Sequence, residues 1–400
     1  MKRMASLLLV VFLLTGQATF ALAQEAKDAD AGATAFSIRL FQEALNSSDK
    51  NVVISPVSAY LALSMAAAGA GGDTLHEFGV VLGAETDTLA AYCASLSDQF
   101  MKTQGSTIIR IANSGWVDES FQIDPKYLDR IKSVMNAEAF VMDLDTNMTR
   151  EAVNDWVKEK TSGLIPMLLN QNLSEDAVLA LINTLYFKAR WRDPFEANDT
   201  FERAFHRMDG SDVNVPFMNE WRSDRDYIHV DGVEGILRPY DDGKTALIAL
   251  RATDGRSARA LAGSLKADTR LKYIASARET YMNLSIPKFT LDFNMTMNDV
   301  LKAMGLKKAF DPELAEFADM GKSADGNIFI SEVYQKVRIG VNEEGTEAAA
   351  ATIVGMLSGS AMPIEEPVEL IMDSPFVYAV VELDTGIPLF IGCMDDPALL

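Results

Sequence analysis

Val341-Asn-Glu-Glu-Gly-Thr-Glu-Ala-Ala-Ala-Ala-Thr-Ile-Val354 is the stretch around which the rest of this chain can be interpreted. It follows a strand-like run over residues 328–340, and no charged side chain occurs from Ala348 to Ile364. A surface loop normally carries charge and turn residues, so this composition is unusual for one. Small residues without proline suit a strand that enters a crowded sheet, because proline removes a backbone donor and large side chains clash. Alanine is also the best helix former, so an Ala-rich helix is the competing interpretation.

As a strand, the stretch would have two different faces, because alternate side chains point to opposite sides. One face would carry small residues and two hydroxyls, namely Thr346, Ala348, Ala350, Thr352 and Val354. The other face begins with the charge of Glu347, which must stay in water, and continues with Ala349, Ala351 and Ile353. Gly345 stands where a hinge needs backbone freedom. We therefore expect Thr346 to face the core.

The segment Glu343-Glu-Gly-Thr-Glu-Ala-Ala-Ala-Ala-Thr352 resembles the hinge of the reactive-centre loop of inhibitory serpins. The resemblance implies an α+β serpin fold with three β-sheets, about eight or nine helices and an exposed reactive-centre loop over about residues 343–363. The hinge that it implies consists of Glu343, Gly345, Thr346, Glu347, Ala348, Ala349, Ala350, Ala351 and Thr352.

Other motifs are similar to serpin signatures and extend the resemblance over roughly the whole chain after its first residues. They lie at 51–78, 183–195, 283–289 and 374–392. With no linker and no repeat in between, we expect one domain over residues 24–400.

The resemblance also implies a polar region beneath the sheet, where the sheet must open. Ser55, Ser58 and Asn183 match its polar residues, and Trp191 matches a tryptophan at the point where the loop first enters the sheet. Trp191 is equally interpretable as an ordinary core aromatic. Where the family usually has a histidine that bonds the asparagine, this chain has Gln335. A glutamine can also donate and accept, but the detail of that polar contact is open.

Periodicity and turn signals predict the elements along the chain. The expected helices are 31–45, 57–70, 74–82, 86–102, 125–135, 150–161, 258–276 and 298–304. Ser55 and Pro56 form the start signal of the second helix. The expected strands are 51–54, 108–117, 139–142, 177–187, 328–340, 376–381 and 387–392, with a meander of short strands over 213–250.

The N-terminus has the pattern of a signal peptide over residues 1–23. Lys2 and Arg3 precede an apolar run that is too short to span a bilayer, and Ala21-Leu-Ala23 forms a small-residue cleavage site. A secreted protein, extracellular or periplasmic, is expected, and the compact signal suits a bacterium. An N-terminal membrane anchor is the alternative.

The formal net charge is −21, which makes nucleic acid and anionic membrane surfaces poor partners. The two cysteines, Cys93 and Cys393, are too few for a disulfide scaffold. A single bridge between them is conceivable, but two buried free thiols are the simpler interpretation. The helix predicted over residues 86–102 is acidic, so a heparin-dependent switch, which serpins build on basic residues there, is not supported.

No motif points to an enzyme, a metal or a cofactor. His76, His206 and His229 lack metal-ligand spacing, and no nucleophile elbow is present. A spatial catalytic triad cannot be read from sequence order, so a secreted hydrolase stays as a competing hypothesis.

The resemblance implies a covalent complex with a target serine peptidase, formed when the enzyme cuts the loop and the hinge enters the central sheet. Family spacing places the cut at Gly359–Ser360, with Leu357 and Met362 as alternatives. Because the neighbouring residues are small or apolar, elastase-, subtilisin- or chymotrypsin-like enzymes are favoured over trypsin-like ones. A cysteine peptidase target and a non-inhibitory carrier or chaperone remain open. A monomer is expected, with a risk of loop–sheet polymerisation.

Overall fold

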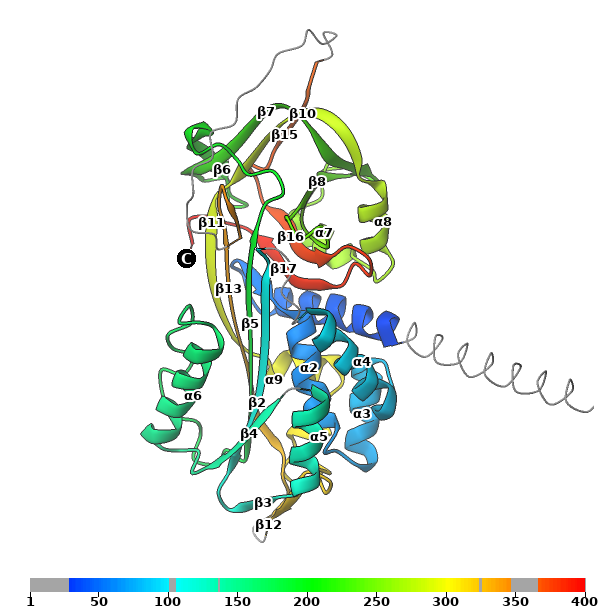
Figure 1. Cartoon of the computed structure of the whole chain (residues 1–400), viewed down its shortest axis with the longest axis vertical. Coiled ribbons are helices and arrows are strands. Elements are labelled where there is room, and N and C mark those ends of the chain that lie inside the picture. Colours follow the sequence, from blue (N-terminus) through cyan, green and yellow to red (C-terminus); the bar gives the residue numbers. More distant parts are fainter. Residues whose placement is uncertain (1–28, 101–105, 136, 324–325, 347–365, 400) are drawn as a thin grey trace, which may run out of the picture.

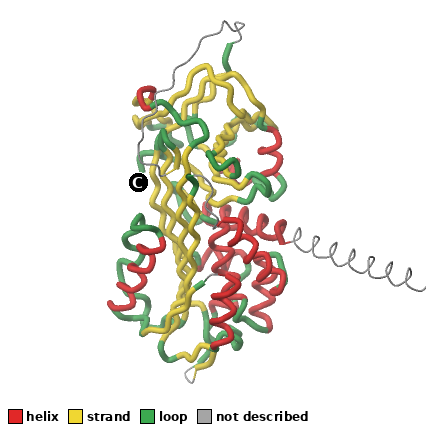
Figure 2. Tube along the Cα trace, viewed as in Figure 1, coloured by secondary structure: helices red, strands yellow, loops and turns green. Residues whose placement is uncertain are grey.

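The computed structural model describes residues 29–100, 106–135, 137–323, 326–346 and 366–399. Within these residues the chain has nine α-helices and three β-sheets, which confirms the predicted α+β class and its three sheets. Figure 1 shows an elongated molecule with a strand-rich end above and most helices below, and Figure 2 shows the same division by secondary structure. The predicted signal peptide, residues 1–23, lies outside the described residues and stays a prediction.

The helices agree with the periodicity in position and mostly in length. The first spans residues 29–46. The others are α2 Pro56–Ala67, α3 Gly72–Leu82, α4 Thr86–Phe100, α5 Pro125–Met135, α6 Asn147–Lys160, α7 Ala258–Ser264, α8 Thr269–Ser276 and α9 Asn298–Met304. In the described part of the chain, no helix is long and apolar enough to cross a bilayer.

Two helix predictions need correction. The helix expected over residues 258–276 is two helices, because Leu265 adopts an extended backbone with ψ of 142° and ends α7. The helix expected from Arg150 begins at Asn147, because the Thr146 hydroxyl accepts the amide proton of Thr149 and caps an earlier start. The start signal of α2 is confirmed, since Ser55 is its N-cap residue and Pro56 its first residue, although the Ser55 side chain makes no capping hydrogen bond.

The largest sheet has nine strands in the order β1-β17-β16-β9-β8-β7-β10-β15, with β6 paired to β7. Its strands are β1 Val52–Ile54, β6 Thr200–His206, β7 Asp212–Val230, β8 Val233–Pro239, β9 Thr245–Ala252, β10 Arg278–Pro287, β15 Val368–Ile371, β16 Phe376–Glu382 and β17 Pro388–Met394. The meander of short strands was wrong for its first part. β7 is one strand of 19 residues that pairs with β6, β10 and β8 along its length.

The second sheet has six strands in the order β11-β13-β14-β5-β2-β4, and it is the sheet that holds the candidate site. Its strands are β2 Ile108–Asp118, β4 Glu138–Met142, β5 Leu179–Arg190, β11 Phe289–Thr296, β13 Ile330–Val341 and β14 Gly345–Thr346. A two-stranded sheet of β3 Phe121–Ile123 and β12 Gly321–Ser323 closes the lower end in Figure 1.

Helices cover both faces of the six-stranded sheet. The twelve residues of α2 are all buried, which explains why its sequence is apolar on every side. α2 packs against β2 and β5 on one face, and α6 contacts the same two strands from the opposite face (Figure 1). β5 is therefore a central strand buried on both faces, as its continuous apolar run predicts.

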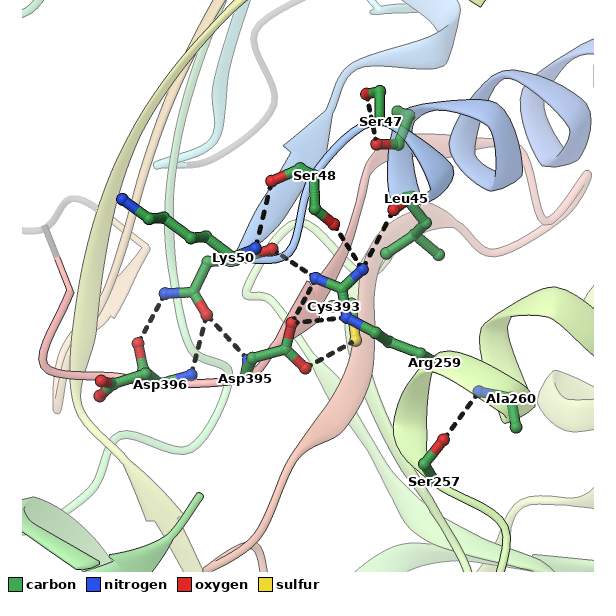
Figure 3. A network of polar contacts seen from close by, with 12 residues as sticks. Leu45, Ser47, Ser48, Lys50, Ser257, Arg259, Ala260, Cys393, Asp395 and Asp396 are labelled. Carbon is green, nitrogen blue, oxygen red and sulfur yellow. Dashed lines mark hydrogen bonds and ion pairs between the residues drawn. The ribbon is translucent and has the colours of Figure 1, made fainter. Parts of the chain in front are cut away.

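Arg259 of α7 ties the end of the chain to the segment that follows the first helix. Its guanidinium donates to the carbonyls of Leu45, Ser48 and Lys50 and to the Asp395 carboxylate, at 2.7 to 3.0 Å (Figure 3). Asn51 adds backbone contacts, since its side-chain oxygen accepts from the amides of Asp395 and Asp396. We call the contacts of Arg259 and Asn51 the C-terminal clasp.

The two cysteines are free thiols, and both are buried. Burial raises the pKa of the Cys93 thiol to about 12, so it stays protonated and inert. Burial also raises the pKa of Cys393, which lies beside the clasp. The prediction of two buried free thiols is confirmed.

Candidate functional site

The candidate site begins where the predicted hinge meets the six-stranded sheet. Gly345 and Thr346 form β14, which lies between β13 and β5 and runs antiparallel to both. Thr346 pairs with Val341 on one side and with Ala189 on the other. Below this point β13 and β5 pair directly with each other in parallel, from Ile330–Leu179 to Val337–Leu185. Gly345 and Thr346 of the predicted hinge thus already occupy the position of an additional strand.

Gly345 is required at this position by the close approach of β5. A Cβ at Gly345 would lie 2.0 Å from the carbonyl oxygen of Ala189, which no side chain could tolerate. The turn before it is held by Asn342, whose side-chain oxygen accepts the amide protons of Glu344 and Gly345. The glycine that the sequence marks as a hinge is therefore also a packing necessity.

Thr346 points into the core and is fully buried. Its hydroxyl lies 2.7 Å from the Tyr240 hydroxyl, and the Tyr240 ring stacks on Trp191 with centroids 4.6 Å apart. Trp191 donates its indole proton to the carbonyl of Asn342 at 2.8 Å, and its amide donates to the carbonyl of Glu344. Trp191 is thus both a buried aromatic and the residue that holds the start of the loop.

Glu343 and Glu344, the two glutamates just before Gly345, are held by ion pairs at the edge of the site. Glu344 pairs with Arg190, and Glu343 accepts from Lys288 and from the Thr200 hydroxyl, each at 2.9 Å. Burial raises the pKa of the Glu343 carboxyl, but the bonds from Lys288 and Thr200 outweigh burial, so its pKa lies below the ordinary value.

A buried polar cluster joins β5, β13 and α2 further down the same gap. The Asn183 side-chain oxygen accepts from Ser58 at 2.5 Å and from Gln335 at 2.9 Å. Its nitrogen donates to the Ser58 carbonyl and to the Asn113 side chain. Asn183, 1% exposed, therefore uses both donors and both acceptor positions.

Gln335, which the resemblance places where the family usually has a histidine, has hydrogen-bond partners for both ends of its amide. Its nitrogen donates to the Ser55 carbonyl and to Asn183, and its oxygen accepts the Ser55 amide proton. Ser55 contributes through its backbone, since its hydroxyl has no hydrogen-bond partner among the described residues. The cluster contains no titratable group, unlike a cluster built on histidine. We call Asn113, Asn183, Gln335, Ser55 and Ser58 the seam cluster.

Several predicted site residues lie outside the described residues. They are Glu347, Ala348, Ala349, Ala350, Ala351, Thr352, Leu357, Gly359, Ser360 and Met362. Conversely, sequence reasoning missed Asn113, Tyr240, Thr200 and Lys288. Asn113 falls opposite Asn183 in the β2–β5 register, so a polar pair on two apolar strands was the signal available for it. The other three carry no local signal.

Comparisons with known proteins agree with this geometry. A family model described as "Serpin (serine protease inhibitor)" matches residues 31–397. Serpin-ZXA of rice (Oryza sativa subsp. japonica) is 33% identical and covers 92% of this chain and 96% of its own length.

Two solved structures are also similar. The native state of tengpin, a thermophilic serpin, superposes with a TM-score of 0.85 at 30% identity, over 92% of this chain and 94% of that one. Thyroxine-binding globulin in complex with thyroxine has a TM-score of 0.81 at 23% identity, over 92% and 99%, which shows a shared fold.

Proposed function

The chain belongs to the serpin family, and from this premise we propose that it is an irreversible suicide-substrate inhibitor of serine peptidases. A peptidase would cut the loop that follows Thr346 and form an acyl-enzyme, and the freed loop would insert between β13 and β5. The observation that carries the proposal is the placement of Gly345 and Thr346 between these two strands, paired to both.

The register of β14 supports a specific path for the inserted loop. Carried on from the pairs Thr346–Val341 and Thr346–Ala189, it brings Ala350 beside Val337 and Leu185. Two residues later, Thr352 would fall between Gln335 and Asn183. Its hydroxyl would take the place of their mutual hydrogen bond within the seam cluster. The small side chains of the hinge suit this path, because the core beneath the sheet is already close-packed and leaves no room for large side chains.

Insertion would exchange one parallel pairing for two antiparallel ones, which are more stable per residue. About ten residues would enter the sheet, each contributing roughly 1 kcal/mol net from a backbone hydrogen bond, so about 10 kcal/mol would be released. The native state would therefore be held kinetically, with the seam cluster keeping β5 and β13 together until the loop is cut.

The bond to be cut is proposed as Gly359–Ser360, with Leu357 and Met362 as alternatives. The absence of Arg and Lys from this part of the loop favours elastase-, subtilisin- or chymotrypsin-like enzymes, and cysteine peptidases are a second target class. A loop of strand-like composition would also carry a risk of insertion into a second copy of the chain. The secreted location belongs to the same proposal, because such targets are extracellular or periplasmic.

The alternative function, a non-inhibitory carrier, would need a cavity for its ligand. An apolar cavity lies between the first helix, α8 and the strands β9, β16 and β17. Its volume of about 50 Å³ is far below the roughly 300–1,000 Å³ of typical ligand pockets. This apolar cavity therefore gives no support to a carrier of ligands of that size.

The test is to mix the protein with a panel of elastase-, subtilisin-, chymotrypsin- and trypsin-like peptidases. An inhibitor gives a covalent adduct that survives denaturation, and the mass of the released C-terminal peptide identifies the bond. Complete cleavage of the loop by every peptidase, with no adduct and full recovery of enzyme activity, would contradict the proposal.

A further inference from the structure

Two large aromatic side chains are stacked on the outside of the strand-rich end. Phe201 of β6 and Trp221 of β7 have ring centroids 6.3 Å apart with an interplanar angle of 9°, and each is 47% exposed. The other three tryptophans, Trp116, Trp156 and Trp191, are buried. Half-exposed aromatics of this size are typical of sites that anchor a protein partner.

A β-bulge presents Trp221 to solvent. Between the pairs Glu220–Leu284 and Ser223–Met282, β7 has two residues, Trp221 and Arg222, opposite the single residue Asn283 of β10. Arg222 takes the left-handed conformation with φ of 52°, which is uncommon for a non-glycine residue. Its amide donates to the Asn283 side chain at 2.8 Å, which holds the bulge in place. Bulges often redirect a side chain in this way beside a functional site.

The aromatic pair lies between the two anchored ends of the reactive-centre loop. At the start of the loop, Glu343 accepts from Thr200, the residue before Phe201. At its end, Glu369 of β15 accepts from Asn283, which in turn binds the backbone next to Trp221. Figure 1 places β6, β7, β10 and β15 together at this end of the molecule. A peptidase bound to the loop would therefore face the pair.

We propose that Phe201 and Trp221 form a second contact surface for the target peptidase. This surface would bind an apolar patch at the rim of the peptidase's substrate cleft. The proposal rests on the proposed function, because its partner is the enzyme that attacks the loop. The pair would bind the enzyme before the loop is cut and would select among peptidases that cut the same sequence. We infer that the partner is the target peptidase because residues on both sides of the loop, Glu343 and Glu369, are hydrogen-bonded to residues beside the pair.

The experiment uses an elastase- or subtilisin-like peptidase whose catalytic serine is replaced by alanine, so that it binds but cannot cut. The variant carries Phe201→Thr and Trp221→Thr, because threonine is polar and suits a strand. The control is Val80→Thr, a 60% exposed residue of α3, which lies at the opposite end of the molecule from β15 (Figure 1). We expect the double variant to bind the inactive enzyme at least about tenfold more weakly and the control to bind like the parent.

A second measurement on the unchanged chain labels its tryptophans with 5-fluorotryptophan. The Trp221 resonance, assigned by its loss in the variant, should shift when the inactive enzyme is added. Equal binding by parent and double variant would overturn the proposal, as would failure of every inactive peptidase to bind the parent. The proposal would also be overturned if the Trp221 resonance shifted on loop cleavage alone, because the loop would then cover the pair. A shift on raising the protein concentration alone would overturn it as well, because a second copy of the chain would then cover the pair.

These outcomes are separable from the test of the inhibitory mechanism. If the active peptidase cleaves the parent without forming an adduct, while the inactive enzyme still distinguishes the double variant, the trapping mechanism fails and the contact surface stands. If adducts form at the same rate with and without the two aromatics, only the contact surface fails.

Discussion

The gap between β5 and β13 and the C-terminal clasp hold the molecule together in different ways. Along the gap, the two strands pair in parallel, and five buried polar residues of the seam cluster bridge them to each other and to α2. At the clasp, β17 pairs antiparallel with both β1 and β16, and Arg259 binds three carbonyls and a carboxylate (Figure 3).

These two kinds of contact indicate that the fold can rearrange at the gap and that it stays fixed at the clasp. Side-chain hydrogen bonds in the seam cluster can be exchanged for bonds to an incoming strand at little net cost, since partners of the same kind replace one another. A half-buried arginine bound to three carbonyls and a carboxylate has no such substitute. We therefore expect the gap to control inhibition and the clasp to control stability.

Cutting the loop should give the largest effect. If the freed strand fills the gap, about 10 kcal/mol of new pairing raises the midpoint of thermal unfolding on the order of 20 °C. Calorimetry before and after cleavage measures it. A matched cut at an engineered site beside Gly210, an exposed turn glycine, should not raise the midpoint. An unchanged midpoint after loop cleavage would show that no strand enters the gap between β5 and β13.

Replacing Thr346 by Arg should be the next largest effect. The side chain is fully buried against Tyr240, so a charge there must leave the sheet or lie unpaired in the core. We expect the yield of covalent adduct to fall at least about tenfold, with the protein cleaved as a substrate. Thr346→Ser, which keeps the hydroxyl, is the control. An arginine variant that inhibits like the parent would show that Thr346 does not face the core during insertion.

At the clasp, Arg259→Lys should lower the free energy of unfolding by about 2–3 kcal/mol, because an ammonium cannot reach three carbonyls and Asp395 together. Denaturant unfolding measures this loss. The fraction of encounters that end in an adduct should not change. Arg256→Lys, at an exposed pair with Asp254, should cost less than about 0.5 kcal/mol. A large loss of adduct in Arg259→Lys would contradict the separation of the two regions.

The smallest effect should be the pH dependence of the hinge contact. Because the folded pKa of Glu343 lies below its ordinary value of 4.5, its contribution to stability is complete above pH 4.5. The contribution is lost as the pH falls through the folded pKa. The difference in thermal midpoint between the parent and Glu343→Gln should be constant from pH 7 to about 4.5 and should shrink below that. A difference in thermal midpoint that grows as the pH falls would contradict the predicted direction of this pH dependence.

Much of this architecture follows from local pattern. The apolar run of β5 and the all-apolar α2 predict buried elements, because each can be stable only when covered on all sides. The break between α7 and α8 and the 19 residues of β7 were not predictable in the same way. The length of β7 depends on β6, β8 and β10, which pair with it. The end of α7 depends on Gln42, whose side chain donates to the carbonyls of Ala262, Gly263 and Leu265. No local signal records these partners.

The sequence by itself determined the hinge: Gly345, its small uncharged continuation and the serpin motifs are local choices of side-chain size and charge. Only the tertiary structure decided what the hinge touches. Thr346 meets Tyr240 across 106 residues, and Asn183 meets Ser58 across 125. The physical reason is that a buried hydrogen bond depends on where two distant strands or helices are packed, whereas a strand that must enter a sheet needs small residues wherever its partners come from.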